Sequence, residues 1–239
     1  MLKKIDEQTL FYFSKHKIVY IGNGRPRIEW MDQDNTEFVS SINFLTSILY
    51  RWMPELIVFD SLERADIPLL RQNEKLARVP VLILQHDFDN VNDLSGFEIF
   101  PRLFFCNYAV SSSLDFALHL LKIIEKKSFL LPSSTGFLVK KTIVYMNKNK
   151  DKKISRQSLA DNAGVTDDYL GKIFKSETGL HMWTYLNIYR MDLACKLVLE
   201  TGLSINEISR RTGFIDPSYF TRVFRQFYGS TPASLRKKN

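Results

Sequence analysis

An internal repeat near the end of the chain most constrains how it can fold. Residues 158–179 read SLADNAGVTDDYLGKIFKSETG, and residues 207–229 read EISRRTGFIDPSYFTRVFRQFYG. The two copies align with one inserted residue, so that Gly164, for example, matches Gly213. Each copy is too short to fold alone, and each has the pattern of a short helix, a turn with glycine and a second helix. We therefore expect two helix-turn-helix units that pack on a shared element.

The segment between the two copies predicts a single long helix. Residues 182–201 contain no glycine or proline, and an α-helix of that length is about 30 Å long. One turn of B-DNA is about 34 Å long, the spacing at which two recognition helices enter successive major-groove segments on one face. Apolar side chains give this helix a face for both copies: Leu186, Tyr189, Leu193, Leu197 and Val198. One polypeptide could then bind DNA as dimers of helix-turn-helix repressors do.

Local signals place the second helix of each copy. Thr166 or Asp167 can accept hydrogen bonds from backbone N–H groups at the start of the first copy's helix, and Asp216 can do so in the second copy. Pro217 then takes the first helical position, where its missing N–H has no cost. The predicted buried side chains are Leu170, Ile173 and Phe174 in the first helix and Tyr219, Phe220, Val223 and Phe224 in the second.

Charge is divided unevenly along the chain. Residues 1–135 carry 15 Lys and Arg against 17 Asp and Glu, a net charge of −2, and residues 136–239 carry 18 against 9, a net charge of +9. Together these give the +7 of the whole chain. A basic C-terminal part beside a near-neutral N-terminal part favours a module that binds a polyanion. A basic surface that is merely solvated is the alternative that charge by itself leaves open.

Composition and spacing exclude several other classes of protein. No uncharged apolar run approaches the roughly 18–20 residues that span a bilayer, and the charged N-terminus is a poor secretory signal. We therefore expect a cytoplasmic protein without membrane contact. Cys106 and Cys195 lie far apart in apolar surroundings, which favours two free thiols. The 4 histidines show no ligand spacing, so we expect neither a metal site nor a cofactor.

The N-terminal part alternates short apolar runs with helical patterns. Such alternation predicts a mostly parallel sheet covered by helices, an α/β fold. The strand-like runs are residues 17–23, 27–32, 54–60, 80–85 and 102–108, and the helical patterns are residues 36–52, 62–78 and 111–127. We expect this domain to occupy residues 1–127, with a linker at 128–135 and a second domain at 136–239.

The C-terminal part resembles the DNA-binding domain of the AraC family of bacterial transcription regulators. The resemblance covers residues 136–238 and includes both repeats, the sequence GFIDPSYFTRVFRQFYGSTPASLR, and Arg190, Ala194 and Leu197 in the linking helix. It implies an all-α double helix-turn-helix domain whose recognition helices are residues 166–177 and 216–227. The implied base-facing positions are Asp168, Gly171 and Lys172 in the first helix, and Pro217, Ser218, Thr221 and Arg222 in the second.

The chemistry of these side chains supports part of that assignment. Arg222 can make two hydrogen bonds to guanine, Asp168 can accept one from cytosine N4, and Thr221 can meet a thymine methyl group. Gly171 has no side chain to read a base, so the first helix is expected to be the weaker reader. The residues better suited to phosphates are Lys172, Lys175, Arg210, Arg211 and Arg225. The predicted DNA-binding set is therefore Thr166, Asp168, Gly171, Lys172, Lys175, Arg210, Pro217, Ser218, Thr221, Arg222 and Arg225.

A second resemblance covers residues 17–127. The order of elements, the sequence LIVFD ending in Asp60 and the sequence PVLIL resemble the receiver domain of two-component response regulators, a flavodoxin-like fold. The resemblance implies a phosphoryl group on Asp60. That family also has an acidic pair, a Ser or Thr, and a Lys at strand ends, where this chain has Gly22 with Asn23, Gln85, and Asn107. Since Mg²⁺ prefers oxygen ligands such as carboxylates, we expect a degenerate receiver-like domain in which Asp60 caps a turn. The helix between the first two strands is also expected to be missing.

Together these patterns predict a sequence-specific DNA-binding transcription regulator rather than an enzyme. Double-stranded DNA is the expected partner, with a homodimer through the N-terminal domain and RNA polymerase as further partners. Two alternatives stay open for the signal: phosphorylation of Asp60, and a small molecule bound by residues 1–135. An α/β enzyme fused to a DNA-binding tail would need a nucleophile–base pair or a phosphate-binding glycine loop, and the sequence shows neither.

Overall fold

Five parallel strands form one sheet in the N-terminal half, in the order β2-β1-β3-β4-β5. The structure is a computed structural model that describes residues 5–24, 26, 28–31, 34–60, 79–86, 103–125 and 136–238. The strands are β1 (Ile18–Ile21), β2 (Thr36–Val39), β3 (Leu56–Asp60), β4 (Val81–Gln85) and β5 (Leu103–Asn107). The first four residues of β1, β3 and β4 are all buried, as expected for strands covered on both faces. This arrangement confirms the α/β fold predicted for this half.

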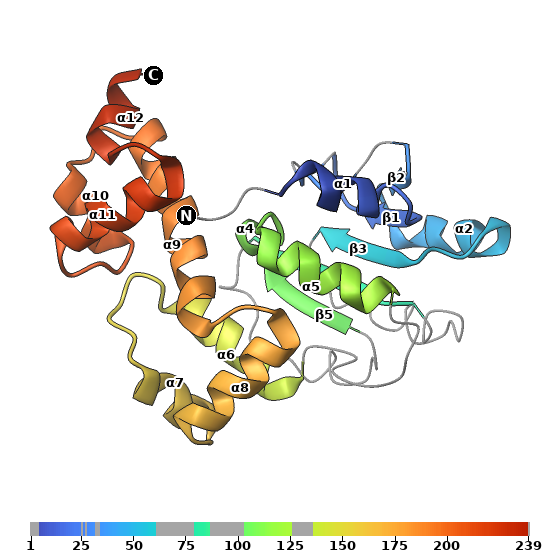
Figure 1. The fold of residues 1–239 in the computed structure, drawn as a ribbon, viewed down its shortest axis with the longest axis horizontal. Helices are drawn as coiled ribbons and strands as arrows, with labels where there is room; N and C mark the ends of the chain where they lie inside the picture. The colour runs from blue at the N-terminus through green and yellow to red at the C-terminus, as the bar shows by residue number, and fades with distance from the viewer. Residues whose placement is uncertain are drawn as a thin grey trace.

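Short helices and one loop cover the sheet. The helices are α1 (Glu7–Phe13), the 3₁₀ turn η1 (Ile42–Phe44), α2 (Leu45–Arg51), α4 (Tyr108–Ser111) and α5 (Leu114–Glu125). α1 packs against α5, and the two lie side by side in Figure 1. The Trp30 ring stacks on Phe13 with ring centroids 4.8 Å apart, and Trp30 Nε1 donates a hydrogen bond of 2.8 Å to the Ser111 carbonyl oxygen. The loop after β1 thus supplies part of the core that a helix in that connection would supply.

Two of the predicted N-terminal elements are wrong. The second strand is β2 rather than residues 27–32, and β2 takes the first four residues of the helix predicted over 36–52. Thr36 pairs with Ile18 of β1, whereas Trp30 is buried against α1. A strand of four residues at the edge of a sheet is too short for its periodicity to be distinguished from that of the helix that follows.

Other N-terminal predictions agree with the structure or cannot be compared with it. As predicted, no helix joins β1 to β2 among the described residues of that connection. The helical pattern of residues 62–78 and the linker at 128–135 lie outside the described residues. No helix in the described ranges is both long enough and apolar enough to cross a membrane.

Seven helices follow in the described C-terminal part, residues 136–238. They are α6 (Phe137–Lys148), α7 (Arg156–Ala163), α8 (Asp167–Thr178), α9 (Met182–Glu200), α10 (Ile205–Arg211), α11 (Pro217–Tyr228) and α12 (Pro232–Lys238). We call α7 with α8 the first unit and α10 with α11 the second unit. Figure 1 shows α9 running from one unit to the other. The observed helices confirm the repeat of two helix-turn-helix units and the long helix between them.

The apolar core is divided between two clusters that meet along α9. The first cluster runs from the sheet through α6, α7 and α8 and includes α9 as far as Ile188. The second begins at Met191 of α9 and includes Phe220 and Phe224 of α11. The first unit therefore shares its core with the α/β half, while the second unit has a core of its own.

Polar contacts also join the first unit to the end of β5. The Asn107 backbone N–H donates a hydrogen bond of 2.6 Å to the Tyr185 hydroxyl, and Asn107 Nδ2 donates one of 3.1 Å to Asn147 Oδ1. On α5, His119 Nε2 donates a hydrogen bond of 3.1 Å to the Glu177 carbonyl oxygen at the end of α8. Burial lowers the pKa of His119, which favours the neutral ring at this contact.

Candidate nucleic-acid interface

Capping side chains fix the start of each helix in the first unit. Ser155 and Ser158 cap α7 reciprocally, with two side chain to backbone hydrogen bonds of 3.0 Å. Gly164 ends α7 at φ 76°, a conformation that disfavours residues with a side chain. Thr166 then caps α8 by accepting a hydrogen bond of 3.4 Å from the Tyr169 N–H. The turn between the helices is therefore set by local sequence, as predicted.

The second unit uses the same devices with different residues. Ser204 accepts a hydrogen bond of 3.1 Å from the Glu207 N–H at the start of α10, and Gly213 forms the turn at φ 76°. Asp216 caps α11 by accepting a hydrogen bond of 2.8 Å from the Ser218 N–H, and Pro217 occupies the first turn. The observed bounds of α8 and α11 begin and end one residue later than predicted.

Helix α8 presents its polar side chains to solvent. Asp168, Lys172 and Lys175 are exposed, while the helix turns its apolar side inward. Gly171 is half-buried, and a side chain there would meet nothing closer than Met182 Cε, 3.9 Å from its first carbon. The outward face of α8 thus carries one carboxylate and two ammonium groups, with no side chain at Gly171 between them.

Helix α11 carries the other predicted base-facing residues. Ser218, Arg222 and Arg225 are exposed, and Pro217 and Thr221 are half-buried beside them. The Thr221 hydroxyl donates a hydrogen bond of 2.9 Å to the Pro217 carbonyl oxygen. With the hydroxyl so occupied, the methyl group is the part of Thr221 that is available to a thymine.

One residue predicted to lie inside α11's core faces outward. Tyr219 is 42% exposed, whereas Phe220, Val223 and Phe224 are buried as predicted. The Arg222 guanidinium lies over the Tyr219 ring, 5.1 Å from its centroid. The prediction for Tyr219 is wrong because this side of α11 borders a groove rather than the core.

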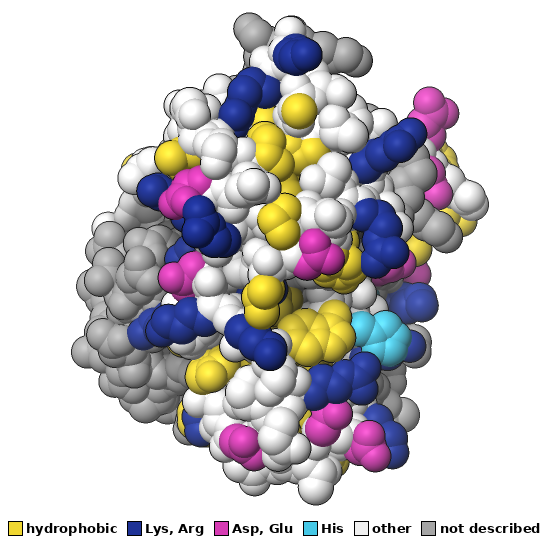
Figure 2. All heavy atoms as spheres, turned by 90° about the vertical axis from the view of Figure 1, so that its left-hand side faces the viewer, with side chains coloured by type: hydrophobic (Ala, Val, Ile, Leu, Met, Phe, Trp, Pro, Cys, Tyr) yellow, Lys and Arg dark blue, Asp and Glu magenta, His cyan; other side chains and the backbone are white. Residues whose placement is uncertain are grey.

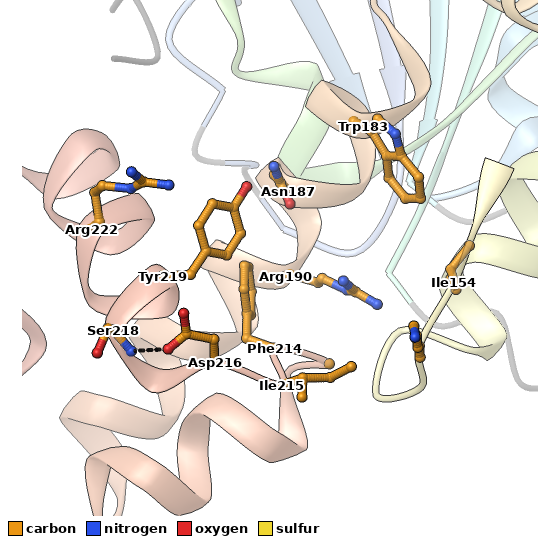
Figure 3. Close-up of a pocket in the computed structure, with 12 residues that line it drawn as sticks. Ile154, Trp183, Asn187, Arg190, Phe214, Ile215, Asp216, Ser218, Tyr219 and Arg222 are labelled. Atoms are coloured by element: carbon orange, nitrogen blue, oxygen red, sulfur yellow. Dashed lines mark hydrogen bonds between the residues drawn. The ribbon is translucent and has the colours of Figure 1, made fainter.

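The groove lies between the second unit on one side and α9 with the loop before α7 on the other, and has a volume of about 710 Å³. Three of its residues come from α9 (Trp183, Asn187 and Arg190), two from the loop before α7 (Lys153 and Ile154), and the rest from the second unit (Gly213, Phe214, Ile215, Asp216, Ser218, Tyr219 and Arg222). Figure 3 shows Tyr219 pointing from α11 toward Asn187 on α9. The sequence reasoning did not select the α9 residues. Their spacing of four and three places them on one helix face, which is the signal that could have found them.

The basic residues differ in how free they are to meet phosphates. Glu207 accepts hydrogen bonds of 2.9 Å from Arg210 Nη2 and 3.0 Å from Arg211 Nε, and these cations hold the pKa of Glu207 below its usual value. Arg222 and Arg225 form no ion pair within the described part of the chain. Figure 2 shows Lys and Arg along the whole height of one face, from the second unit at the top to the first unit at the bottom.

In the N-terminal half, Asp60 at the carboxyl end of β3 already has a hydrogen-bond partner. His86 Nε2 donates a hydrogen bond of 2.6 Å to Asp60 Oδ1, and the His86 ring stacks on Tyr108 with centroids 4.1 Å apart. The hydrogen bond with His86 is the main reason that the pKa of Asp60 is lowered. Asp60 therefore binds a side chain at the carboxyl edge of the sheet, while the residues after it, where the predicted turn would lie, are outside the described residues.

The backbone leaves little room for acidic neighbours around Asp60. A side chain at Gly22 would place its first carbon 2.5 Å from Asp60 Cβ, closer than two carbons can approach. Asn23 is exposed, and Gln85 and Asn107 occupy the other strand ends. No group of three His, Cys, Asp or Glu side chains that could hold a metal ion is found within the described ranges.

Comparisons with known proteins place the similarity in the C-terminal part. The family model "Helix-turn-helix domain" matches residues 159–238. The xylose operon regulatory protein of Escherichia coli (strain K12) is 31% identical over 118 residues, which are 49% of this chain and 30% of that protein. The uncharacterized transcriptional regulatory protein YesN of Bacillus subtilis (strain 168) is 41% identical over 76 residues, which are 31% of this chain and 21% of YesN. The chain thus spans less than a third of the length of these relatives.

One solved structure is also similar to part of this chain. The C-terminal domain of AraT, a response regulator from Geobacillus stearothermophilus, has 28% sequence identity and a TM-score of 0.43. The match covers 44% of this chain and 88% of that one.

Proposed function

We propose that this chain, whose residues 159–238 form an AraC-type helix-turn-helix domain, is a cytoplasmic transcription regulator that binds a two-part DNA site. The observation that carries the proposal is the presence of two capped, outward-facing helices, α8 and α11, joined by the continuous helix α9. Arg222 on α11 supplies the fork that suits guanine. Lys172, Lys175 and Arg225 supply cations for phosphates.

We infer further that DNA binding does not require phosphorylation. The strand order of the sheet is that of flavodoxin-like folds, which supports the receiver-like interpretation of the N-terminal half. Phosphoryl transfer depends on neutralising charge around the transferred group. Asp60 has His86 as its partner, and the crowding at Gly22 leaves no space for an acidic side chain at that position. The N-terminal half then serves as a scaffold, with a homodimer and RNA polymerase as predicted contacts.

Acetyl phosphate tests this inference directly. The full chain is incubated with acetyl phosphate and Mg²⁺, and its intact mass and DNA affinity are measured beside those of Asp60→Asn. We expect no phosphoryl adduct on either protein and equal DNA affinity for both. A mass increase of one phosphoryl group that disappears in Asp60→Asn would establish a working receiver and overturn the inference.

A further inference from the structure

Helix α9 changes from one core to the other at Arg190. The buried residues of its first half end at Ile188, in the cluster that includes the sheet, and those of its second half begin at Met191, in the cluster of the second unit. Arg190 lies between them and is only 7% exposed. Phe227 of α11 also packs on both clusters. The relative position of the two units is therefore decided around this point of the helix.

The Arg190 guanidinium contacts the loop before the first unit and the turn of the second unit. Its Nε donates a hydrogen bond of 2.9 Å to the Lys150 carbonyl oxygen, and its Nη2 donates one of 2.7 Å to the Lys152 carbonyl oxygen. Both carbonyls belong to the loop that leads into α7. On the other side, the guanidinium lies 5.6 Å from the centroid of the Phe214 ring, in the turn of the second unit. The Arg190 side chain thus connects the loop before α7 to the turn of the second unit.

The backbone at Gly213 packs closely at this same contact between the loop before α7, Arg190 and the turn of the second unit, which we call the junction. A side chain there would place its first carbon 2.3 Å from the Lys150 carbonyl oxygen and 2.5 Å from Arg190 Nη2. Gly164, its equivalent in the first unit, has the same φ of 76° but nothing within 4 Å of that position. Glycine at 164 is needed for the turn alone, whereas glycine at 213 is needed for the turn and for close contact between the units.

The guanidinium keeps its charge in this setting. Burial lowers the pKa of Arg190 to about 10, which leaves it protonated at neutral pH, and the nearby charge of Asp151 opposes the shift. A charged donor strengthens hydrogen bonds to carbonyl oxygens. The junction therefore holds across the physiological pH range.

We propose that Arg190 is a positioning residue that fixes the relative position of α8 and α11, so that this chain accepts one spacing between the two halves of its DNA site. The proposal rests on the proposed function. The length of α9 sets the distance between the two units. Bending or twisting of α9 at Arg190, where the two apolar clusters meet, would still move α8 or α11 along or around the DNA duplex. Contacts made to the side of α9, by Arg190 with the Lys150 loop and the Phe214 turn, resist that movement.

A series of DNA spacers tests the consequence. The wild-type chain first selects its site from random duplexes, and the spacing between the two halves is then shortened or lengthened by one base pair. Loss of one reader's contacts on a shifted site should lower wild-type affinity about tenfold or more. Arg190→Met, which keeps the apolar stem, should bind all spacings with similar affinity. Arg190→Lys should recover part of the discrimination, because its ammonium can still donate to both carbonyls.

Arg236→Met is the matched control. Arg236 Nε also donates to a carbonyl of α9, that of Val198 at 3.2 Å, but this contact joins α12 to α9 and does not involve the loop before α7. This variant should keep the wild-type spacing preference. An Arg190→Met protein that discriminates between spacings as the wild type does would overturn the proposal, and so would an equal loss of affinity at every spacing.

A distance measurement without DNA separates this proposal from the proposed function. Spin labels are attached at Ser176→Cys and Gln226→Cys, two exposed positions on α8 and α11, after Cys106 and Cys195 have been replaced. The distribution of label distances should be narrow with Arg190 and broad with Arg190→Met. If Arg190→Met does not fold, Phe214→Leu tests the same junction. Unchanged distributions overturn the proposal, whereas failure to select any DNA sequence counts against the proposed function alone.

Discussion

Two arginines of the second unit differ in whether a neighbouring carboxylate already holds their charge. Arg210 is exposed and basic, but it shares the Glu207 carboxylate with Arg211. Arg222 has no carboxylate partner within the described residues and lies over the Tyr219 ring. The sequence predicts both as DNA contacts, because a charge pattern does not reveal which cations are already paired. Of these two arginines, only Arg222 combines exposure, a guanidinium without a carboxylate partner among the described residues, and a place on α11.

Replacement of Arg222 tests its role as a reader. Arg222→Ala should weaken binding to the selected site by about 1–3 kcal/mol and relax the preference at one base pair. Fluorescence anisotropy on the selected site and on its single-base variants measures both effects. Arg210→Ala is the matched control and should cost less, without a change in preference. An equal loss for Arg222→Ala on every sequence would show that Arg222 contacts phosphate only.

At the scale of elements, the sequence predicts the recognition helices closely and the sheet edge poorly. The bounds of α8 and α11 follow from caps and glycine turns, which act within a few residues. The sequence does not predict β2, because strand formation at Thr36–Val39 depends on pairing with β1, a contact between residues that lie apart in the sequence. The outward position of Tyr219 was missed for the same kind of reason, since periodicity does not show that the groove lies beside α11.

Two glycines that end equivalent helices offer a matched pair of variants. Gly179 and Gly229 end α8 and α11 at φ 75° and 72°, so alanine at either position should cost about 1–2 kcal/mol. At Gly229 nothing lies within 4 Å, but at Gly179 the new carbon would lie 2.6 Å from His119 Cβ on α5. Gly179→Ala should therefore cost about 1–3 kcal/mol more, as overpacking does. Urea unfolding of the full chain measures the difference. Equal losses would mean that α5 does not press on the end of α8.

At the scale of the whole molecule, the α/β half and the first unit share a core, whereas the sequence predicts two separate domains joined by a linker. The sequence predicts the two folds and the basic C-terminal part, which follow from periodicity and composition. It does not predict that Tyr185 of α9 meets Asn107 of β5, or that one apolar cluster extends across both halves. Such contacts arise only when the folded halves pack together.

Separation of the halves should therefore destabilise the first unit. A fragment of residues 136–239 would expose side chains that the α/β half buries, and each large apolar side chain contributes about 1.5–3 kcal/mol when buried. We expect the fragment to unfold at a lower temperature than the full chain and to bind a dye specific for exposed apolar surface. Addition of the 1–135 fragment should reverse part of this effect. A fragment as stable as the full chain, with no dye binding, would argue that the shared core adds nothing.

We propose above that two helices on one chain read DNA without a phosphoryl signal. The most direct measurement is the affinity of untreated full-length protein for its selected duplex and for a scrambled duplex, at about 150 mM salt. We expect the selected duplex to bind about 10³-fold tighter or more than the scrambled one, with weaker binding when either half of the site is scrambled. Equal affinity for both duplexes, or specific binding only after treatment with acetyl phosphate, would contradict it.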